Sequence, residues 1–183
     1  MTEQVFSLAQ FGRRLGTRLE GRKAQDAIFS ALSALPEGGV LVLSLSGVEV
    51  LSGSFADEAI AKVLARLKDG ALPGRCLCIR TPSLELLEDL EGKLHQRRLA
   101  VLVTVEGLEG WKVFGWLPQY MGNVFSYVMR RGEARSPEVA QALGISVKQA
   151  SLALRRLAEL RLLRAEREAR PAGGYQHRYF PLV

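Results

Sequence analysis

The feature that most constrains the fold is an alternation of short apolar runs and helical segments along the first 105 residues. The β-type runs lie at residues 4–9, 40–51, 75–80 and 99–105, and we expect the second to be a buried strand that leaves the sheet near Gly47. Segments with the apolar spacing of helices lie between them, at residues 24–35, 54–70 and 83–98. Strands and helices that alternate at this length favour a mixed sheet with helices packed against it, so we predict an α/β (α+β) fold here.

The alternation ends at residues 106–123, EGLEGWKVFGWLPQYMGN, which are rich in Gly and contain one Pro and two Trp. This composition predicts a hairpin or a packed connector between domains. We place the boundary near Gly115 and expect two domains, residues 1–112 and 116–183. The aromatic residues Trp111, Phe114 and Trp116 fit an interdomain core better than a ligand cage.

The net charge of +6 is distributed unevenly between the two parts of the chain. Residues 1–112 hold 14 Lys+Arg and 14 Asp+Glu, whereas residues 113–183 hold 11 Lys+Arg and 5 Asp+Glu. The excess positive charge therefore lies entirely in the C-terminal part. Such asymmetry indicates a polyanionic partner for that part, although a basic surface that is only solvated has the same composition.

From Pro118 onward the pattern is helix, helix, turn, helix, hairpin. In the first helix, residues 118–132, we expect Val124, Phe125, Val128 and Met129 to face inward. Ser136 is expected to cap the second helix, with Pro137 at its first position, and Ser146 to cap the third. Gly144 permits the left-handed turn between them.

The third helix carries an apolar stripe on one side and a polar surface on the other. Val147, Ala150, Leu154 and Leu157 recur at helical spacing and are expected to be buried. The run RLLRAEREARPAGGYQHRYFPL then predicts two strands around the turn-forming PAGG.

The segment SPEVAQALGISVKQASLALRRLAELRLLRAERE…GGYQHRYF resembles the winged helix-turn-helix of bacterial transcription regulators such as MarR-like proteins. In such domains the third helix enters the major groove of DNA, and the hairpin, or wing, follows the backbone or the minor groove. The resemblance implies a double-stranded DNA partner. It also implies that the N-termini of the second and third helices, at Ser136 and Ser146, approach phosphates.

The resemblance also gives roles to individual side chains. Lys148 and Gln149 are expected to read base edges, and Ser151 is a weaker candidate. Phosphate contacts are expected from the arginines of the third helix and the hairpin, with His177 nearby: Arg155, Arg156, Arg164, Arg170 and Arg178. Leu152 lies on the same outward face, where it would pack against thymine methyl groups or, alternatively, against a dimer partner or the N-terminal domain.

The N-terminal stretches FGRRLGTRLEGRKA and LVLSLSGVEVLSGSFADEAIAKVLARL resemble STAS-like domains of unknown function, relatives of anti-sigma-factor antagonists. In the antagonists a serine before a helix is phosphorylated by a partner kinase. Ser54 falls on that position, but Ser52 and Phe55 replace the flanking aspartate and glycine of the motif. Ser54 is therefore a candidate phospho-acceptor or simply a helix N-cap.

A basic segment, GRRLGTRLEGRK, places five cations close together near the N-terminus. They are Arg13, Arg14, Arg18, Arg22 and Lys23. The segment is either the solvated start of a helix or a site for an anion or an acidic partner surface.

Several classes of protein are not indicated by the sequence. His95 and His177 are the only histidines and lie in different domains without a nearby nucleophile, and no phosphate-binding glycine loop is present, so we expect neither an enzyme nor a cofactor or metal. No apolar run is long enough to span a membrane, and no secretory signal is visible. Cys76 and Cys78 are expected to be buried thiols of a cytoplasmic protein.

Together these features predict a cytoplasmic DNA-binding transcriptional regulator, most simply a homodimer, with an N-terminal STAS-like domain that senses a signal or a regulatory protein. The alternative is an interaction module of an anti-sigma or kinase circuit, in which the winged helix contacts protein.

Overall fold

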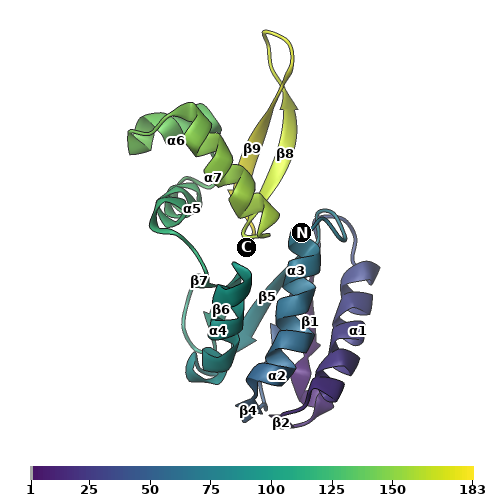
Figure 1. The fold of residues 1–183 in the computed structure, drawn as a ribbon. Coiled ribbons are helices and arrows are strands. Elements are labelled where there is room, and N and C mark those ends of the chain that lie inside the picture. Colours follow the sequence, from purple (N-terminus) through teal and green to yellow (C-terminus); the bar gives the residue numbers. More distant parts are fainter. Residues whose placement is uncertain (1) are drawn as a thin grey trace. The chain divides into compact units, whose positions relative to one another are not determined.

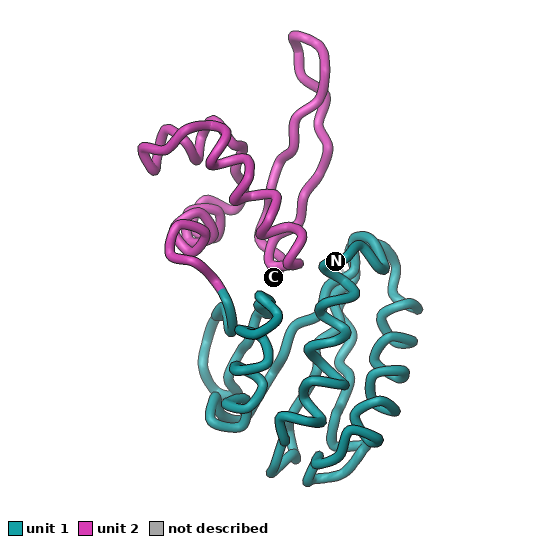
Figure 2. Tube along the Cα trace, viewed as in Figure 1, with its two compact units in different colours: residues 1–116 teal, residues 117–183 magenta. Residues whose placement is uncertain are grey.

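The computed structural model describes residues 2–183 and divides the chain into two compact units, residues 1–116 (unit 1) and 117–183 (unit 2) (Figures 1 and 2). Each unit has its own set of buried apolar side chains.

Unit 1 is built on a five-stranded sheet with the strand order β1-β3-β5-β6-β7. Its strands are β1 (Glu3–Ser7), β3 (Val40–Ser44), β5 (Cys76–Thr81), β6 (Ala100–Val105) and β7 (Lys112–Gly115). The first four strands are parallel and β7 is antiparallel to β6. The expected mixed α/β architecture is therefore confirmed, and β3 is buried along its whole length, as is usual for a parallel strand.

The run at residues 40–51 leaves the main sheet near Gly47, as expected, and continues as a second, separate strand. After β3 the chain leaves the main sheet through a turn at Gly47, where φ is +83°. It then forms β4 (Val50–Leu51), which pairs in parallel with β2 (Arg14–Leu15) in a separate small sheet.

Helical segments connect neighbouring parallel strands, and three of them lie side by side in Figure 1. The first is α1 (Arg18–Ala34) and the last is α4 (Glu88–Arg97). The second is a continuous run of three elements: α2 (Gly53–Ala56), a π-helical turn (Asp57–Ala61) and α3 (Lys62–Lys68). α1 starts earlier than the apolar spacing indicated, because Thr17 caps it in a capping box with Glu20. Within residues 2–183 no helix is long and apolar enough to cross a membrane.

The N-cap of α2 differs from the expectation. Ser52, not Ser54, is the N-cap, and its Oγ accepts a hydrogen bond from Phe55 N (3.2 Å) and donates one to Gly16 O (2.6 Å). Ser54 lies inside the first turn, half-buried. Asp57, three residues after Ser54, accepts a pair of hydrogen bonds from Arg97.

That pair joins the π-helical turn to the end of α4. Arg97 Nε and Nη2 donate to the two Asp57 carboxylate oxygens at 2.8 and 3.0 Å. Two parallel charge-assisted bonds favour the ionised carboxylate, so the guanidinium holds the pKa of Asp57 below its ordinary value despite burial.

Stability should therefore depend on pH through Asp57. Because the folded-state pKa is lowered, the stabilisation is complete above the unfolded pKa, about 4, and is lost as pH falls through the folded value. We expect Asp57→Asn to cost about 1.5–3 kcal/mol at pH 7 and clearly less near pH 2. Urea unfolding of both proteins at the two pH values measures this; an equal cost at both would show that the ionised pair does not stabilise unit 1.

The connector at residues 106–116 closes unit 1 as a hairpin, one of the two forms that its composition predicted. β7 pairs with β6 through the register Ala100↔Gly115 to Val103↔Lys112. Trp111, Phe114 and Trp116 are half-buried within this hairpin region. Their expected place in a core between domains stays a prediction.

Unit 2 has three helices followed by a hairpin, in the order expected for a winged helix-turn-helix. The elements are α5 (Gln119–Arg131), α6 (Ser136–Leu143), α7 (Val147–Glu159), β8 (Leu163–Ala169) and β9 (Tyr175–Pro181). In α5, Val124, Phe125 and Val128 are buried as expected, while Met121 is buried and Met129 only half-buried. Ala134 N and O pair with Tyr179, which ties the loop before α6 to the hairpin.

Candidate nucleic-acid interface

The N-terminus of α7 is set by a tight turn and a complete cap. Gly144 adopts the left-handed conformation, with φ +64°, as its position after α6 requires. Ser146 is the N-cap: its Oγ accepts from Gln149 N at 3.1 Å. Both expectations are confirmed, and they fix the direction in which α7 starts.

The outward surface of α7 carries four residues on one face. Lys148, Ser151, Leu152 and Arg155 are spaced by three, four and seven positions, and all are exposed. The opposite side buries Ala150, Ala153, Leu154 and Leu157. We call the four exposed residues the reading face.

The expected buried stripe of α7 is wrong at its first member. Val147 is 51% exposed, and Ala153 takes part in the buried side instead. Val147 is in the first helical position, at the N-terminal end of α7, so helical spacing alone could not reveal its exposure.

Gln149 is engaged by the cap. Its Oε1 accepts from the Ser146 backbone N–H and from Ser146 Oγ, both at 2.9 Å. A glutamine that reads adenine uses its carbonyl and its amide together. Base reading by Gln149 would therefore require the cap to open, and its expected role stays a prediction.

At α6 the expected N-cap is wrong. Arg135 occupies the N-cap position, Ser136 is the first helical residue and Pro137 the second. The Arg135 backbone N–H donates to Glu138 Oε2 at 2.8 Å. Glu138, three residues after Arg135, was the signal in the sequence that places the cap one residue earlier.

Replacing Ser146 and replacing Ser136 should therefore have different effects on the stability of unit 2. We expect Ser146→Ala to lower the free energy of unfolding of unit 2 by about 1 kcal/mol, because it removes the α7 cap. Ser136→Ala is the matched control, because Ser136 is not an N-cap, and it should change the free energy of unfolding by no more than about 0.5 kcal/mol. Urea unfolding followed by circular dichroism compares them; equal costs would contradict the assignment of the caps.

The two arginines of α7 have different surroundings. Arg155 lies on the reading face and its Nε is 3.8 Å from Glu159 Oε1, an exposed pair that contributes little to stability. Arg156 points toward α5 and donates from Nη1 to the Tyr120 hydroxyl at 2.8 Å. Arg155 is thus presented with the reading face, whereas Arg156 is tied to α5.

The arginines of the hairpin are also partly engaged. Arg164 Nε donates to Pro181 O at 3.2 Å across the two strands. Arg178 pairs with Glu133 (3.5 Å) and Glu166 (3.6 Å). Arg170 and His177 are exposed, with Arg170 beside the turn at Gly173 and Gly174.

A network of ion pairs fastens the hairpin to the start of α6. Arg135 donates from Nε and Nη2 to the Glu168 carboxylate at 2.9 and 3.0 Å, and from Nη1 to Glu138 at 3.3 Å. Gln176 Nε2 also donates to Glu168 at 3.1 Å. The Arg135 guanidinium lowers the pKa of Glu168, so this connection persists to acidic pH.

A cavity of about 240 Å³ lies where α6, α7 and the hairpin meet. It brings together four of the candidate contact residues, namely Ser136, Ser151, Arg170 and His177. Val147 and Tyr175, both exposed, also line it, and neither was among the candidates. Tyr175 additionally stacks under Arg167, whose Cζ is 3.7 Å from the ring centre. The two residues are diagonal neighbours in the hairpin, where Arg167 pairs with His177 and Tyr175 with Ala169.

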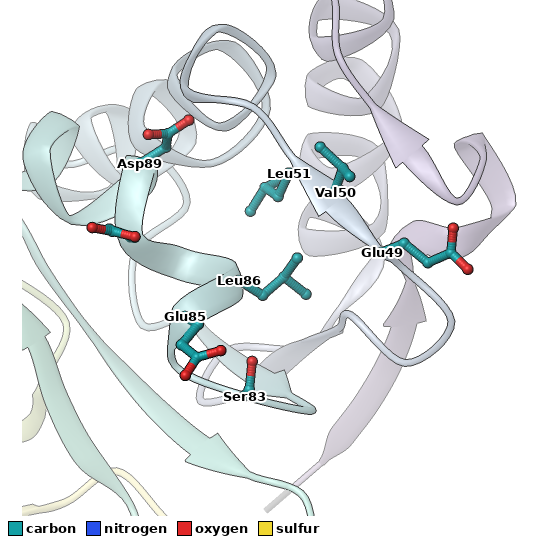
Figure 3. Close-up of a pocket in the computed structure, with 8 residues that line it drawn as sticks. Glu49, Val50, Leu51, Ser83, Glu85, Leu86 and Asp89 are labelled. Carbon is teal, nitrogen blue, oxygen red and sulfur yellow. The ribbon is translucent and has the colours of Figure 1, made fainter.

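The hollows of unit 1 have a different chemistry. A cavity of about 390 Å³ opens between β4 and the start of α4, with Val50, Leu51 and Leu86 inside and Glu49 and Glu85 at its edge (Figure 3). A second, of about 440 Å³, shares Glu88 and Asp89 with it and is lined by Ser54 and Lys93. Asp89 Oδ2 accepts from Gly53 N at 3.0 Å.

Carboxylates outnumber cations around both hollows, because Glu49, Glu85, Glu88 and Asp89 line them together with a single lysine, Lys93. The residues that the structure describes also contain no cluster of His, Cys, Asp or Glu arranged to hold a metal ion.

No family model and no curated protein sequence matches this chain. Among solved structures, a possible transcriptional regulator from Methanosarcina mazei Go1 is 18% identical over 36% of this chain and 56% of that chain, with a TM-score of 0.34. The Aeropyrum pernix ORC1 protein, solved in complex with DNA, is 9% identical over 100% of this chain and 74% of that chain, with a TM-score of 0.33. Similarities this low identify neither a family nor a function.

Proposed function

We propose that the protein is a DNA-binding transcriptional regulator whose unit 2 is a winged helix-turn-helix. The observation that carries the proposal is the reading face of α7, a capped helix that presents Lys148, Ser151, Leu152 and Arg155 together. It lies in a unit with 11 Lys+Arg and 5 Asp+Glu, where attraction to a polyanion is strong.

Each part of the surface has a role in this proposal. Lys148 and Ser151 donate to base edges, and Leu152, 36% exposed, contacts thymine methyl groups. Arg155, Arg170 and His177 contact phosphates on either side of the groove. Arg164 and Arg178 contribute charge while Pro181 O holds Arg164 and the carboxylates of Glu133 and Glu166 hold Arg178.

Unit 1 is proposed to be STAS-like and to receive a signal or a regulatory protein in the cytoplasm of a bacterium. Ser54 lines a cavity beside Lys93, where a phosphate on its hydroxyl would meet one cation and the carboxylates of Glu88 and Asp89. Mass spectrometry of the protein from its host under varied growth conditions tests Ser54; an unmodified serine throughout would remove this role.

A titration of duplex DNA binding against salt tests the central proposal. We expect the logarithm of the binding constant to fall linearly with the logarithm of salt concentration, with a slope of about −0.9 per phosphate contacted and three or more contacts in total. Absence of binding to pooled random and genomic duplexes at low salt would remove the proposal. It would favour the alternative in which the winged helix contacts protein.

A further inference from the structure

A buried carboxylate lies at the seam between α1 and the π-helical turn. Glu58 is 2% exposed, although a charged side chain is rarely buried without partners. The two segments approach closely because Gly21 has no side chain: a Cβ there would lie 2.8 Å from Glu58 Cβ and 3.1 Å from Phe55 O. The seam thus holds Glu58 in one place.

Three cations from two elements surround this carboxylate. Lys62 Nζ is 2.7 Å and Arg22 Nε 3.8 Å from Glu58 Oε2, and Arg18 Nη1 is 3.4 Å from Oε1. The pKa of Glu58 is lowered chiefly by the hydrogen bond from Lys62, so the carboxylate is ionised at neutral pH. One negative charge therefore faces three positive charges.

The surplus charge points outward. The side chains of Arg18, Arg22 and Lys62 are 61%, 65% and 37% exposed, whereas the carboxylate that holds them is not. Arg18 makes one hydrogen bond to Glu58, through Nη1, and Arg22 approaches it through Nε without a hydrogen bond; among residues 2–183 no other side chain pairs with either guanidinium. Their remaining N–H groups can donate to a ligand above the seam.

We propose that Arg18, Arg22 and Lys62 form a binding site for the phosphate group of a small anion. Guanidinium groups match phosphate oxygens through paired N–H donors, and a lysine adds a point charge. A buried carboxylate beneath the cations orients them in advance, which lowers the entropic cost of binding. Because all three converge on a single carboxylate, the site suits a compact anion more than an extended polymer. The phosphate comes from inorganic phosphate or pyrophosphate, or from a nucleotide.

This site lies in unit 1 and is independent of the reading face in unit 2. It gives a role to Arg18 and Arg22 of the basic segment GRRLGTRLEGRK, which the proposed DNA contacts do not use. DNA binding and anion binding can therefore fail separately.

Isothermal titration of the full chain with phosphate, pyrophosphate and ATP, in a buffer dilute enough for a Debye length above about 10 Å, tests the site. We expect saturable binding of pyrophosphate, and equal affinity for ATP if the phosphates alone are recognised or tighter ATP binding if a nucleotide is the source. Arg18→Gln with Arg22→Gln should weaken binding by at least about tenfold, since it removes two charge-assisted donors.

The matched control is Arg14→Gln with Lys23→Gln, which removes the same charge from the same segment but leaves the Glu58 cluster intact. We expect it to weaken binding by less than about twofold, because exposed charges away from the site are screened. Tryptophan fluorescence checks that Arg18→Gln with Arg22→Gln is folded. If it is not, Arg22→Lys takes its place, and loss of the guanidinium fork should still weaken anion binding measurably. The proposal would be overturned if none of the three anions bound saturably, or if the two double variants lost anion affinity equally. It would also be overturned if replacing Arg18 and Arg22 weakened the binding of duplex DNA but not that of the anions.

Discussion

Replacing Lys148 and Arg155 together by alanine is expected to weaken duplex DNA binding by at least about 30-fold, because each contact with a base or phosphate contributes about 1–3 kcal/mol and the two together at least about 2 kcal/mol. Neither side chain is buried or needed for the packing of α7, so the variant should keep its fold. The salt dependence should change as well, with a slope shallower by about 1 to 2, since up to two phosphate or groove contacts disappear. Fluorescence anisotropy with a labelled duplex at several salt concentrations measures both quantities.

The chain offers a matched control for this variant. Arg130 and Arg131 are exposed residues in the last turn of α5, and replacing both by alanine removes the same charge from the same unit. We expect an effect of less than about threefold, reflecting only the loss of long-range attraction. If the two double variants weaken binding equally, the reading face on α7 has been assigned wrongly.

The largest expected loss of stability comes from Gly115→Ala, at about 3–5 kcal/mol. Gly115 has φ +102°, outside the region that other residues adopt readily. An added Cβ would lie 2.7 Å from Leu99 O and 2.9 Å from Leu94 Cβ, so it would push β6 and α4 away from β7. The backbone strain and the steric overlap both lower the free energy of unfolding of the variant.

Gly92→Ala is the control, because the same substitution elsewhere in unit 1 should raise stability and not lower it. Gly92 lies inside α4 with nothing within 4 Å of an added Cβ, so alanine should stabilise the helix by about 0.5–1 kcal/mol. The chain has two tryptophans, Trp111 and Trp116, and both belong to unit 1, so urea unfolding followed by tryptophan fluorescence reports on this unit. A Gly115→Ala variant as stable as the parent would show that β7 does not close the sheet as described.

The sequence was most informative where a local rule determines the structure. Gly144 and Ser146 define the turn and cap of α7 within three residues, and apolar spacing in α5 and α7 identified most of the buried side chains. The order of strands and helices in unit 1 followed from periodicity in the same way. Whether unit 1 is STAS-like stays a prediction, because strand order and helix placement are shared by unrelated families.

Contacts between distant residues could not be predicted. Arg135 and Glu168 meet across 33 residues, and Asp57 and Arg97 across 40, and no pattern in the chain pairs them. The choice of Ser52 over Ser54 as the α2 cap depends on the Gly16 carbonyl that receives its hydroxyl, another tertiary contact. The engagement of Gln149 was predictable in principle, since a glutamine three residues after a serine N-cap is a capping box.

The way α7 is anchored has an evolutionary consequence. The residues that hold the helix in place are its cap, Ser146 with Gln149, and its buried side, Ala150 and Leu154. None of these belongs to the surface proposed to meet a duplex. Mutations at Lys148 or Ser151 can therefore accumulate without unfolding the domain, so that descendants of this chain can acquire new target sites while inheriting the same scaffold.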